Sequence, residues 1–362
     1  MFRLIKTKKS GGRWGEIKTA HGVLKTPFFM PDATRGFVKL TDNGEVRRTK
    51  TEALVVNTFH LYLQPGLRVL EKAGGIHKFM NWSGPLLSDS GGYQVFSLIH
   101  RNPGAGNISD DKVIFRSPLD GSKHELTPEK SIQIQFALGV DMMVCLDDCP
   151  PNEFSRRDLE KAVARTVAWA KRCKFEYERQ IKKRKLRGSK RPLLFAVIQG
   201  GAEIDLREDC TKELVKIGFD GYGFGARPVD KEGKFLGEVL RRTASFIPAD
   251  KLRFALGIGT PEDIIRCASW GWDMFDCVIP TREGRHGKLF AAKQTVNINN
   301  AKFAADFTPI NKNSKISELK THSRSYLHHL FKMNESLGHK LASLNNLEFY
   351  QKLLESLRKP NK

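Results

Sequence analysis

This sequence of 362 residues lacks long apolar runs, patterned cysteines and internal repeats. No segment approaches the ~20 apolar residues of a membrane-spanning helix, and the N-terminus has no apolar core of a signal peptide, so we expect no membrane association. The six cysteines show neither metal-ligand spacing nor the density of a disulfide-linked secreted domain, which favours a reduced, cytoplasmic protein. The missing repeats and low-complexity tracts exclude a solenoid.

Acidic residues are too few to balance the basic ones. Sixty-one Lys and Arg stand against 40 Asp and Glu, a formal net charge of +21. A surplus of this size is typical of a protein that binds a polyanion, and nucleic acid is the first candidate. A lysine-rich proteome would produce the same surplus, so the charge alone does not identify a partner.

Short apolar runs alternate with segments of helical periodicity along most of the chain. This alternation predicts parallel βαβ units, and roughly eight strands predict an α/β fold of the (β/α)8, TIM-type barrel class. The predicted strands lie at residues 27–30, 53–56, 86–87, 142–146, 193–198, 222–224, 254–258 and 274–278. The clearest predicted helices lie at residues 128–138, 156–180, 206–217, 236–244 and 261–268.

A polar side chain closes five of these predicted strands. These residues are Asn57, Asp89, Asp147, Gln199 and Asp276. Active sites of such barrels lie at the carboxyl ends of the strands, where these side chains would meet. Any one of them could simply cap the following helix, but five together favour an active site.

The types of these residues indicate the chemistry. Two carboxylates can divide a glycosidic displacement, since one attacks the sugar carbon while the other moves a proton. Asp276 is followed by Arg282 and Arg285, which suit a phosphate-bearing substrate. Asp147 can accept hydrogen bonds from the N–H groups of a purine, and Gln199 can donate to its carbonyl oxygen, the pattern that guanine presents.

Over nearly its whole length, the sequence resembles the tRNA-guanine transglycosylases, also called queuine tRNA-ribosyltransferases, of the bacterial type. An ordered series of motifs is more specific than any one of them. The matching segments are residues 27–31, 57–61, 89–95, 120–124, 199–201, 257–263 and 273–282.

The resemblance implies an enzyme that exchanges guanine at the wobble position of tRNAs with a GUN anticodon for a 7-deazaguanine, towards queuosine. By position, Asp276 would be the nucleophile that forms a covalent RNA intermediate, and Asp89 the general acid and base. The base would be bound by Ser90, Gly91, Gly92, Tyr93, Asp147, Gln199, Gly225 and Ala226. The RNA would be bound by Gly257, Ile258, Gly259, Thr260, Pro261, Glu262, Asp263, Thr281, Arg282, Glu283, Gly284 and Arg285. No redox or organic cofactor is required.

The sequence departs from the family in its C-terminal subdomain, where the family carries three cysteines and a histidine that bind zinc. The equivalent positions here are Ser314, Ile316, Leu319 and Asn345, which cannot form a zinc site. We therefore predict no metal and no cofactor. We predict a helical subdomain at residues 301–362 that packs on a barrel formed by residues 1–300, held by apolar contacts. The family commonly pairs as homodimers through this region, so the oligomeric state stays open.

A second departure lies in residues 225–231, where Arg227 and Lys231 replace a leucine and a glutamate of the family. Cys149 and Val229 match the bacterial type, which uses 7-aminomethyl-7-deazaguanine. Two added cations would disfavour an aminomethylammonium group if they pointed inward, so queuine and simple guanine exchange remain alternatives. A catalytically silent tRNA-binding subunit and a relative that modifies another nucleic acid are the rival interpretations.

Overall fold

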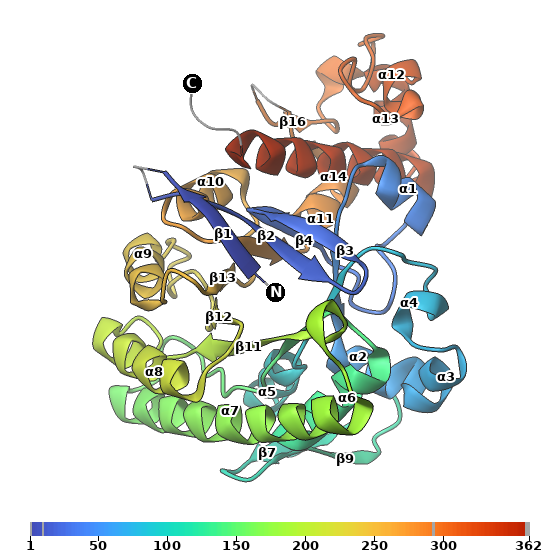
Figure 1. The fold of residues 1–362 in the computed structure, drawn as a ribbon. Helices are drawn as coiled ribbons and strands as arrows, with labels where there is room; N and C mark the ends of the chain where they lie inside the picture. Colours follow the sequence, from blue (N-terminus) through green and yellow to red (C-terminus); the bar gives the residue numbers. More distant parts are fainter. Residues whose placement is uncertain (1, 9–10, 292–293, 359–362) are drawn as a thin grey trace.

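A barrel of eight parallel strands forms the centre of the protein (Figure 1). The computed structural model describes residues 2–8, 11–291 and 294–358. Around the barrel the strand order is β4-β14-β13-β12-β11-β10-β6-β5. The bounds are β4 (Phe28–Pro31), β5 (Leu54–Asn57), β6 (Leu86–Asp89), β10 (Met142–Val144), β11 (Leu193–Ile198), β12 (Gly221–Phe224), β13 (Leu252–Ala255) and β14 (Met274–Cys277). Every strand predicted from an apolar run is present.

The two ends of this sheet meet, because a parallel bridge joins Asp32, just after β4, to Val55 in β5. The backbone N–H of Ala33 donates to the carbonyl of Val55 at 2.8 Å. The strands are buried on both sides, which explains why they read as continuous apolar runs rather than as alternating patterns. The predicted (β/α)8 barrel is confirmed.

Helices surround the barrel and follow most of its strands (Figure 1). The longest, α7 (Arg156–Arg184), begins at Ser155, whose side chain accepts the N–H of Asp158, and buries Trp169 and Tyr177. The other barrel helices are α1 (Asn43–Arg48), α2 (Thr58–Leu61), α3 (Leu67–Lys72), α4 (Ile76–Phe79), α5 (Gly92–Arg101), α6 (Pro128–Leu138), α8 (Ile204–Ile217), α9 (Gly237–Phe246), α10 (Pro261–Ser269) and α11 (Ile279–Arg285). The five helices predicted most clearly are all present. In the described residues, no helix is both long and apolar enough to cross a bilayer.

An antiparallel sheet covers the end of the barrel where the strands begin. It consists of β1 (Phe2–Thr7), β2 (Arg13–Thr19) and β3 (Gly22–Thr26). Ile17 and Leu24 from this sheet are buried in the same cluster as Phe28, Met142 and Phe254 of the barrel interior. Figure 1 shows the sheet lying across the barrel. The interior is therefore a packed core closed at this end, and the opposite end is left for a site. A second sheet, β7 (Gly106–Ile108), β8 (Val113–Arg116) and β9 (Lys123–Leu126), lies between α5 and α6 in the sequence.

The C-terminal segment packs on the barrel as a helical unit. It contains β15 (Lys288–Leu289), β16 (Val296–Asn297), α12 (Ser317–Thr321), α13 (Arg324–Lys332) and α14 (Ser336–Arg358). Its apolar cluster runs from Leu289 to Leu344, while Leu347, Tyr350 and Leu354 of α14 join the main core. Helix α14 thus belongs to both parts. The predicted boundary at residue 300 stays a prediction, and residues 359–362 lie outside the described part.

Asn346 fastens α14 to the barrel through three backbone groups. Its side chain donates to the carbonyls of Pro280 and Lys288 at 2.9 and 2.8 Å, and it accepts the N–H of Phe290 at 2.8 Å. We predict that Asn346→Ala lowers the free energy of unfolding by about 3 kcal/mol, because buried backbone groups lose their partners. Chemical denaturation would measure this, with Glu355→Ala on the exposed face of α14 as the control. Equal stability of the two variants would contradict the assignment.

Candidate active site

The five polar residues predicted to share one rim lie at the carboxyl ends of five barrel strands. Asn57 and Asp89 are the last residues of β5 and β6, and Asp276 is the last residue but one of β14. Asp147 follows β10 and Gln199 follows β11 directly. Because the strands are parallel and in register, these side chains converge at one mouth. The five residues therefore lie at one end of the barrel, and their roles in catalysis and binding stay predictions.

Asp89 is held by three donors from its own and the neighbouring strand. The Asn57 amide donates to Oδ2 at 2.6 Å, and the backbone N–H groups of Thr58 and Gly91 donate to Oδ1 at 3.3 and 3.1 Å. Burial nevertheless raises the pKa of Asp89 to about 7, and the negative charge of Asp276 acts in the same direction. Because their charges interact, the two carboxyl groups lie near each other at the same opening. Both residues are partly exposed to solvent.

Asp276 has fewer partners than Asp89. The backbone N–H of Gly257 donates to its Oδ1 at 3.0 Å, and its other oxygen accepts no hydrogen bond from the described residues. Burial raises the pKa of Asp276 to about 6, and the charge of Asp32 adds to this effect. Asp32 is a fourth rim carboxylate that the sequence analysis missed. It follows β4 as Asp89 ends β6, so the same rule would have found it.

Asp147 and Gln199 form the centre of a second, buried part of the rim. The Gln199 amide nitrogen donates to Asp147 Oδ2 at 2.6 Å, and the amide oxygen of Gln199 has no hydrogen-bond partner in the described part of the chain. Burial raises the pKa of Asp147 to about 7. In this orientation the amide oxygen of Gln199, which accepts hydrogen bonds, is the atom left to contact a ligand. Donation to a purine carbonyl, as we expect, would therefore require the amide to turn over.

The floor of this pocket is set by backbone at the end of β12. A Cβ on Gly225 would lie 2.6 Å from Gln199 Cδ, so only glycine leaves room for that side chain. Ala226 has a φ of 80°, a left-handed conformation that costs an alanine about 1 kcal/mol or more. Cys149 lies against the Ala226 N–H and Gln199, and burial raises its pKa to about 12.

Arg207 is a fully buried positioning residue that the sequence did not reveal. Its guanidinium donates to the carbonyls of Gly201, Ile198 and Gly225 at 2.7, 3.1 and 2.9 Å. It also stacks on the Phe224 ring, 3.9 Å from the centroid. Burial lowers its pKa to about 9. This single side chain ties the end of β11, which carries Gln199, to the end of β12.

Tyr93 stands in the first turn of α5 and is 50% exposed, so it is not a core aromatic. It follows Gly91, which has a φ of 77°, and Gly92, where a Cβ would lie 2.9 Å from Leu146 Cδ1. The Ser90 hydroxyl accepts the Gly92 N–H at 3.2 Å. This tight turn presents the Tyr93 ring at the rim.

The two segments predicted to bind RNA flank Asp276. Residues 257–263 connect β13 to α10, which begins at Thr260, whose hydroxyl accepts the N–H of Asp263. The carbonyl of Gly259 accepts from Tyr350 of α14. Thr281, Arg282, Glu283, Gly284 and Arg285 lie in α11, which packs closely on α14. Arg282 is half exposed beside Glu283, whereas Arg285 is partly buried and interacts electrostatically with Asp32.

Comparison with known proteins agrees with this arrangement. The family model described as queuine tRNA-ribosyltransferase matches residues 8–360. The chain belongs to this family. Curated queuine tRNA-ribosyltransferases of Staphylococcus aureus strains bovine RF122 / ET3-1 and JH9 are each 42% identical over 358 residues, covering 99% of this chain and 91% of theirs. The protein is therefore an enzyme of the transferase class, as predicted.

The loop after β12 carries the two cations, Arg227 and Lys231, that the sequence analysis singled out. Arg227 is exposed. The Lys231 side chain is 71% exposed and lies 3.5 Å from Glu232. The Asn152 amide holds the loop by donating to the carbonyls of Arg227 and Val229, both at 2.9 Å. Both cations are therefore exposed to solvent, where their charges are screened.

Apolar packing and hydrogen bonds hold the C-terminal residues that the sequence analysis compared with the family's zinc positions. Ile316 and Leu319 are buried in the apolar cluster, and the Ser314 hydroxyl accepts the N–H of Ile316 at 2.9 Å. Asn345 accepts from Asn311 at 3.0 Å and donates to the carbonyl of Phe290 at 3.1 Å. Apolar packing and amide hydrogen bonds thus occupy the place where the family has metal ligands. That the protein works without a cofactor stays a prediction.

The raised pKa of Asp276 predicts a pH-dependent cost in stability. Folding raises this pKa from about 3.9 in an unfolded chain to about 6. The native state therefore binds the proton of Asp276 more tightly than the unfolded state does. The stabilisation that comes from this tighter binding is lost as the pH rises from 4 through 6, where the buried carboxyl group ionises. We predict that Asp276→Asn raises the melting temperature at pH 8 but not at pH 4. Asp209→Asn, on the exposed face of α8, should change neither value. A gain that does not depend on pH would contradict the assignment.

Proposed function

We propose that this transferase exchanges guanine at the wobble position of tRNAs with a GUN anticodon for a 7-deazaguanine, through a covalent enzyme–RNA intermediate. One observation carries the proposal: two carboxyl groups with pKa values of about 6 and 7 meet at one barrel mouth. Near neutral pH, the first of these groups is mostly ionised while the second is still partly protonated. A nucleophile and a general acid have to coexist in these states.

In the first displacement, Asp276 attacks the anomeric carbon of the wobble ribose. Its free oxygen has no hydrogen-bond donor among the described residues, so its electron pair is available. The bond between the anomeric carbon and N9 of guanine breaks, and its electron pair leaves with the base. Asp89 donates the proton that neutralises the departing guanine. Positive charge develops on the ribose in the transition state and is stabilised by the adjacent carboxylates.

In the second displacement, the incoming base attacks the same carbon. Asp89, now ionised, takes a proton from the ring nitrogen of the base, and the bond from the ribose to Asp276 breaks. Both carboxyl groups return to their starting states. The two steps are chemically alike because one base replaces another, so no oxidant, reductant or organic cofactor is required.

Recognition of the base is assigned to the pocket around Asp147. An ionised Asp147 accepts from the N–H groups on one edge of a guanine-like base, and Gln199 and the backbone at Gly225 and Ala226 bind the other edges. The exposed ring of Tyr93 stacks on the base. Because Arg227 and Lys231 are exposed to solvent, their charges do not oppose 7-aminomethyl-7-deazaguanine as the incoming base, and queuine is the alternative.

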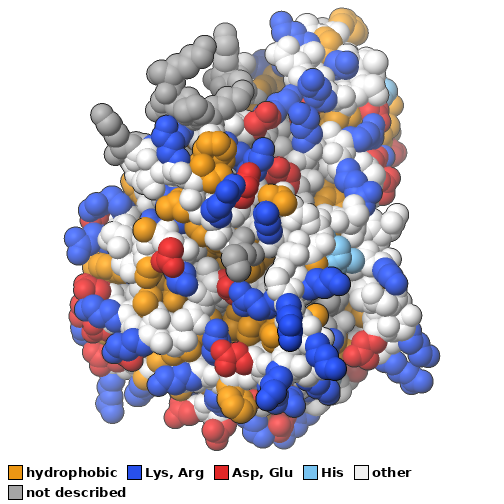
Figure 2. Space-filling model, in the orientation of Figure 1, with side chains coloured by type: hydrophobic (Ala, Val, Ile, Leu, Met, Phe, Trp, Pro, Cys, Tyr) orange, Lys and Arg blue, Asp and Glu red, His pale blue; other side chains and the backbone are white. Residues whose placement is uncertain are grey.

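The tRNA is assigned to the rim formed by residues 257–263 and helix α11. Arg282 and Arg285 supply phosphate or base contacts beside Asp276. The wobble base must leave the anticodon stack to reach a barrel mouth, so we expect base extrusion. The net charge of +21 supports a polyanionic partner. On the face that carries β1–β3, basic side chains are interleaved with acidic ones rather than gathered in one patch (Figure 2).

The direct test is incubation of the protein with radiolabelled guanine and unmodified tRNA that has a GUN anticodon. We expect label to enter this tRNA, and none to enter a tRNA that differs only in carrying adenine at the wobble position. Competition with 7-aminomethyl-7-deazaguanine and with queuine would then rank the incoming bases. A folded protein that binds tRNA but incorporates no label would support the silent-subunit interpretation instead.

A second test addresses the nucleophile. We predict that Asp276→Asn abolishes the covalent protein–RNA adduct on denaturing gels, because an amide oxygen is too weak a nucleophile to attack the ribose. The affinity for tRNA should stay within a few fold, since the substitution removes none of the arginines assigned to the RNA. Asp209→Asn should retain the adduct. An adduct that persists in Asp276→Asn would remove this residue from the proposed mechanism.

A further inference from the structure

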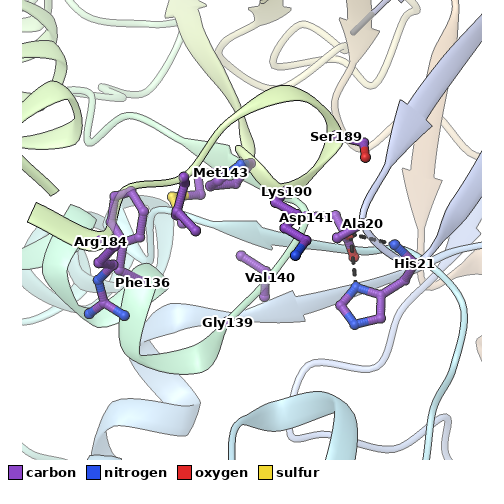
Figure 3. Close-up of a pocket in the computed structure, with 12 residues that line it drawn as sticks. Ala20, His21, Phe136, Gly139, Val140, Asp141, Met143, Arg184, Ser189 and Lys190 are labelled. Carbon is purple, nitrogen blue, oxygen red and sulfur yellow. Dashed lines mark hydrogen bonds and ion pairs between the residues drawn. The ribbon is translucent and has the colours of Figure 1, made fainter. Parts of the chain in front are cut away.

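Three metal-ligating side chains meet at the end of the barrel opposite Asp89 and Asp276. His21 lies in the turn between β2 and β3, His77 lies in α4, and Asp141 directly precedes β10. Their ligand atoms all lie within 4.8 Å of one another, and they are the only such group found among the described residues. His21 and Asp141 also line a cavity of about 300 Å³, where Figure 3 shows them facing each other.

The two imidazoles approach the two oxygens of one carboxylate. His21 Nδ1 lies 2.9 Å from Asp141 Oδ1, and His77 Nε2 lies 3.2 Å from Asp141 Oδ2. The rings are stacked, with centroids 3.6 Å apart and planes inclined by 16°. Atoms that bind one zinc ion tetrahedrally, each about 2.1 Å from it, lie roughly 3.4 Å from one another. The three ligand atoms here already lie within 4.8 Å of one another, so modest side-chain movements would bring them onto a metal ion.

The hydrogen bonds of His77 determine which of its nitrogens is free. Nδ1 lies 3.1 Å from the carbonyl oxygen of Trp82, which can only accept, so Nδ1 carries the hydrogen. In a neutral ring, Nε2 then presents a lone pair towards a carboxylate oxygen. Nε2 is buried and has no partner among the described residues other than this carboxylate oxygen. Two electron-rich atoms at 3.2 Å require a proton or a metal ion between them.

Asp141 is fixed in place by the backbone. The N–H of Leu86 donates to Oδ2 at 3.0 Å, and the N–H of His21 donates to Oδ1 at 3.2 Å. The carboxyl group is fully buried. A ligand histidine whose other nitrogen donates to a carbonyl, next to a carboxylate held by N–H donors, is the outer-shell support that metal sites use.

We propose that His21, His77 and Asp141 bind a divalent transition-metal ion of the zinc class, whose fourth position opens to the cavity. Two imidazoles favour zinc over magnesium or calcium, which prefer oxygen ligands. Arg184 and Lys190 line the same cavity, and their positive charges repel cations. An ion bound here must therefore be held by coordination to the two imidazoles and the carboxylate, and not by electrostatic attraction alone. The ion would tie the β2–β3 turn to α4 and the start of β10. This site is independent of the proposed tRNA chemistry.

The test is zinc binding to the full-length protein after metal has been removed with a chelator. We expect one zinc ion per chain in competition with a chromophoric chelator, visible d–d bands when cobalt is substituted, and a higher melting temperature with zinc. Removing an outer-shell partner weakens metal binding by about 10- to 100-fold, so His21→Ala and His77→Ala, which remove ligands, should each weaken it at least that much. His21 is partly exposed, so its variant should fold.

The matched control is His329→Ala, which removes an exposed histidine from α13. It should bind zinc as the parent protein does. Three outcomes overturn the proposal: no stoichiometric binding, zinc that survives both His21→Ala and His77→Ala, or loss of zinc in the control variant. The first would mean that a proton occupies the space between His77 and Asp141. The other two would place the metal elsewhere, including the C-terminal segment.

Discussion

Removal of water from the carboxyl groups at the barrel mouth is the constraint on which the site depends. Asp89, Asp147 and Asp276 all have raised pKa values, and burial is the largest cause in each case. Their hydrogen bonds oppose this effect but do not cancel it. Buried carboxyl groups lower the free energy of unfolding. The packed interior of the barrel and the β1–β3 sheet offset this loss. The rim can therefore hold three carboxyl groups near their ionisation points.

The wall beside this mouth is built from the C-terminal third of the chain. Helix α11 carries Arg282 and Arg285, and it packs on α14, where a Cβ on Gly284 would lie 2.9 Å from the Ser343 backbone. The amide of Asn346 and the hydroxyl of Tyr350 hold the neighbouring loops. The C-terminal segment thus supplies contacts that hold the segments assigned to RNA. Apolar burial of Ile316 and Leu319 maintains its core.

The barrel and its rim residues were predictable from the sequence because buried parallel strands leave a simple pattern: an apolar run followed by a polar residue. Asp32 fits that rule and was overlooked. Arg207 gives no such signal, since an arginine within a helix usually faces solvent and only the fold shows that it is buried. The cluster of His21, His77 and Asp141 comes from three elements far apart in the chain, so spacing could not reveal it. The roles of the rim residues in catalysis and binding stay predictions.

The pairing of β4 with β14 has a consequence for how the chain folds during synthesis. β4 is the first barrel strand to leave the ribosome, and β14, which pairs with it in parallel through Phe28 and Met274, is the last. Until β14 is made, the edge of β4 has no neighbour on that side. Contacts between such distant parts of a chain form slowly. The nascent protein must therefore carry an open, aggregation-prone sheet edge until almost all of the barrel has been translated.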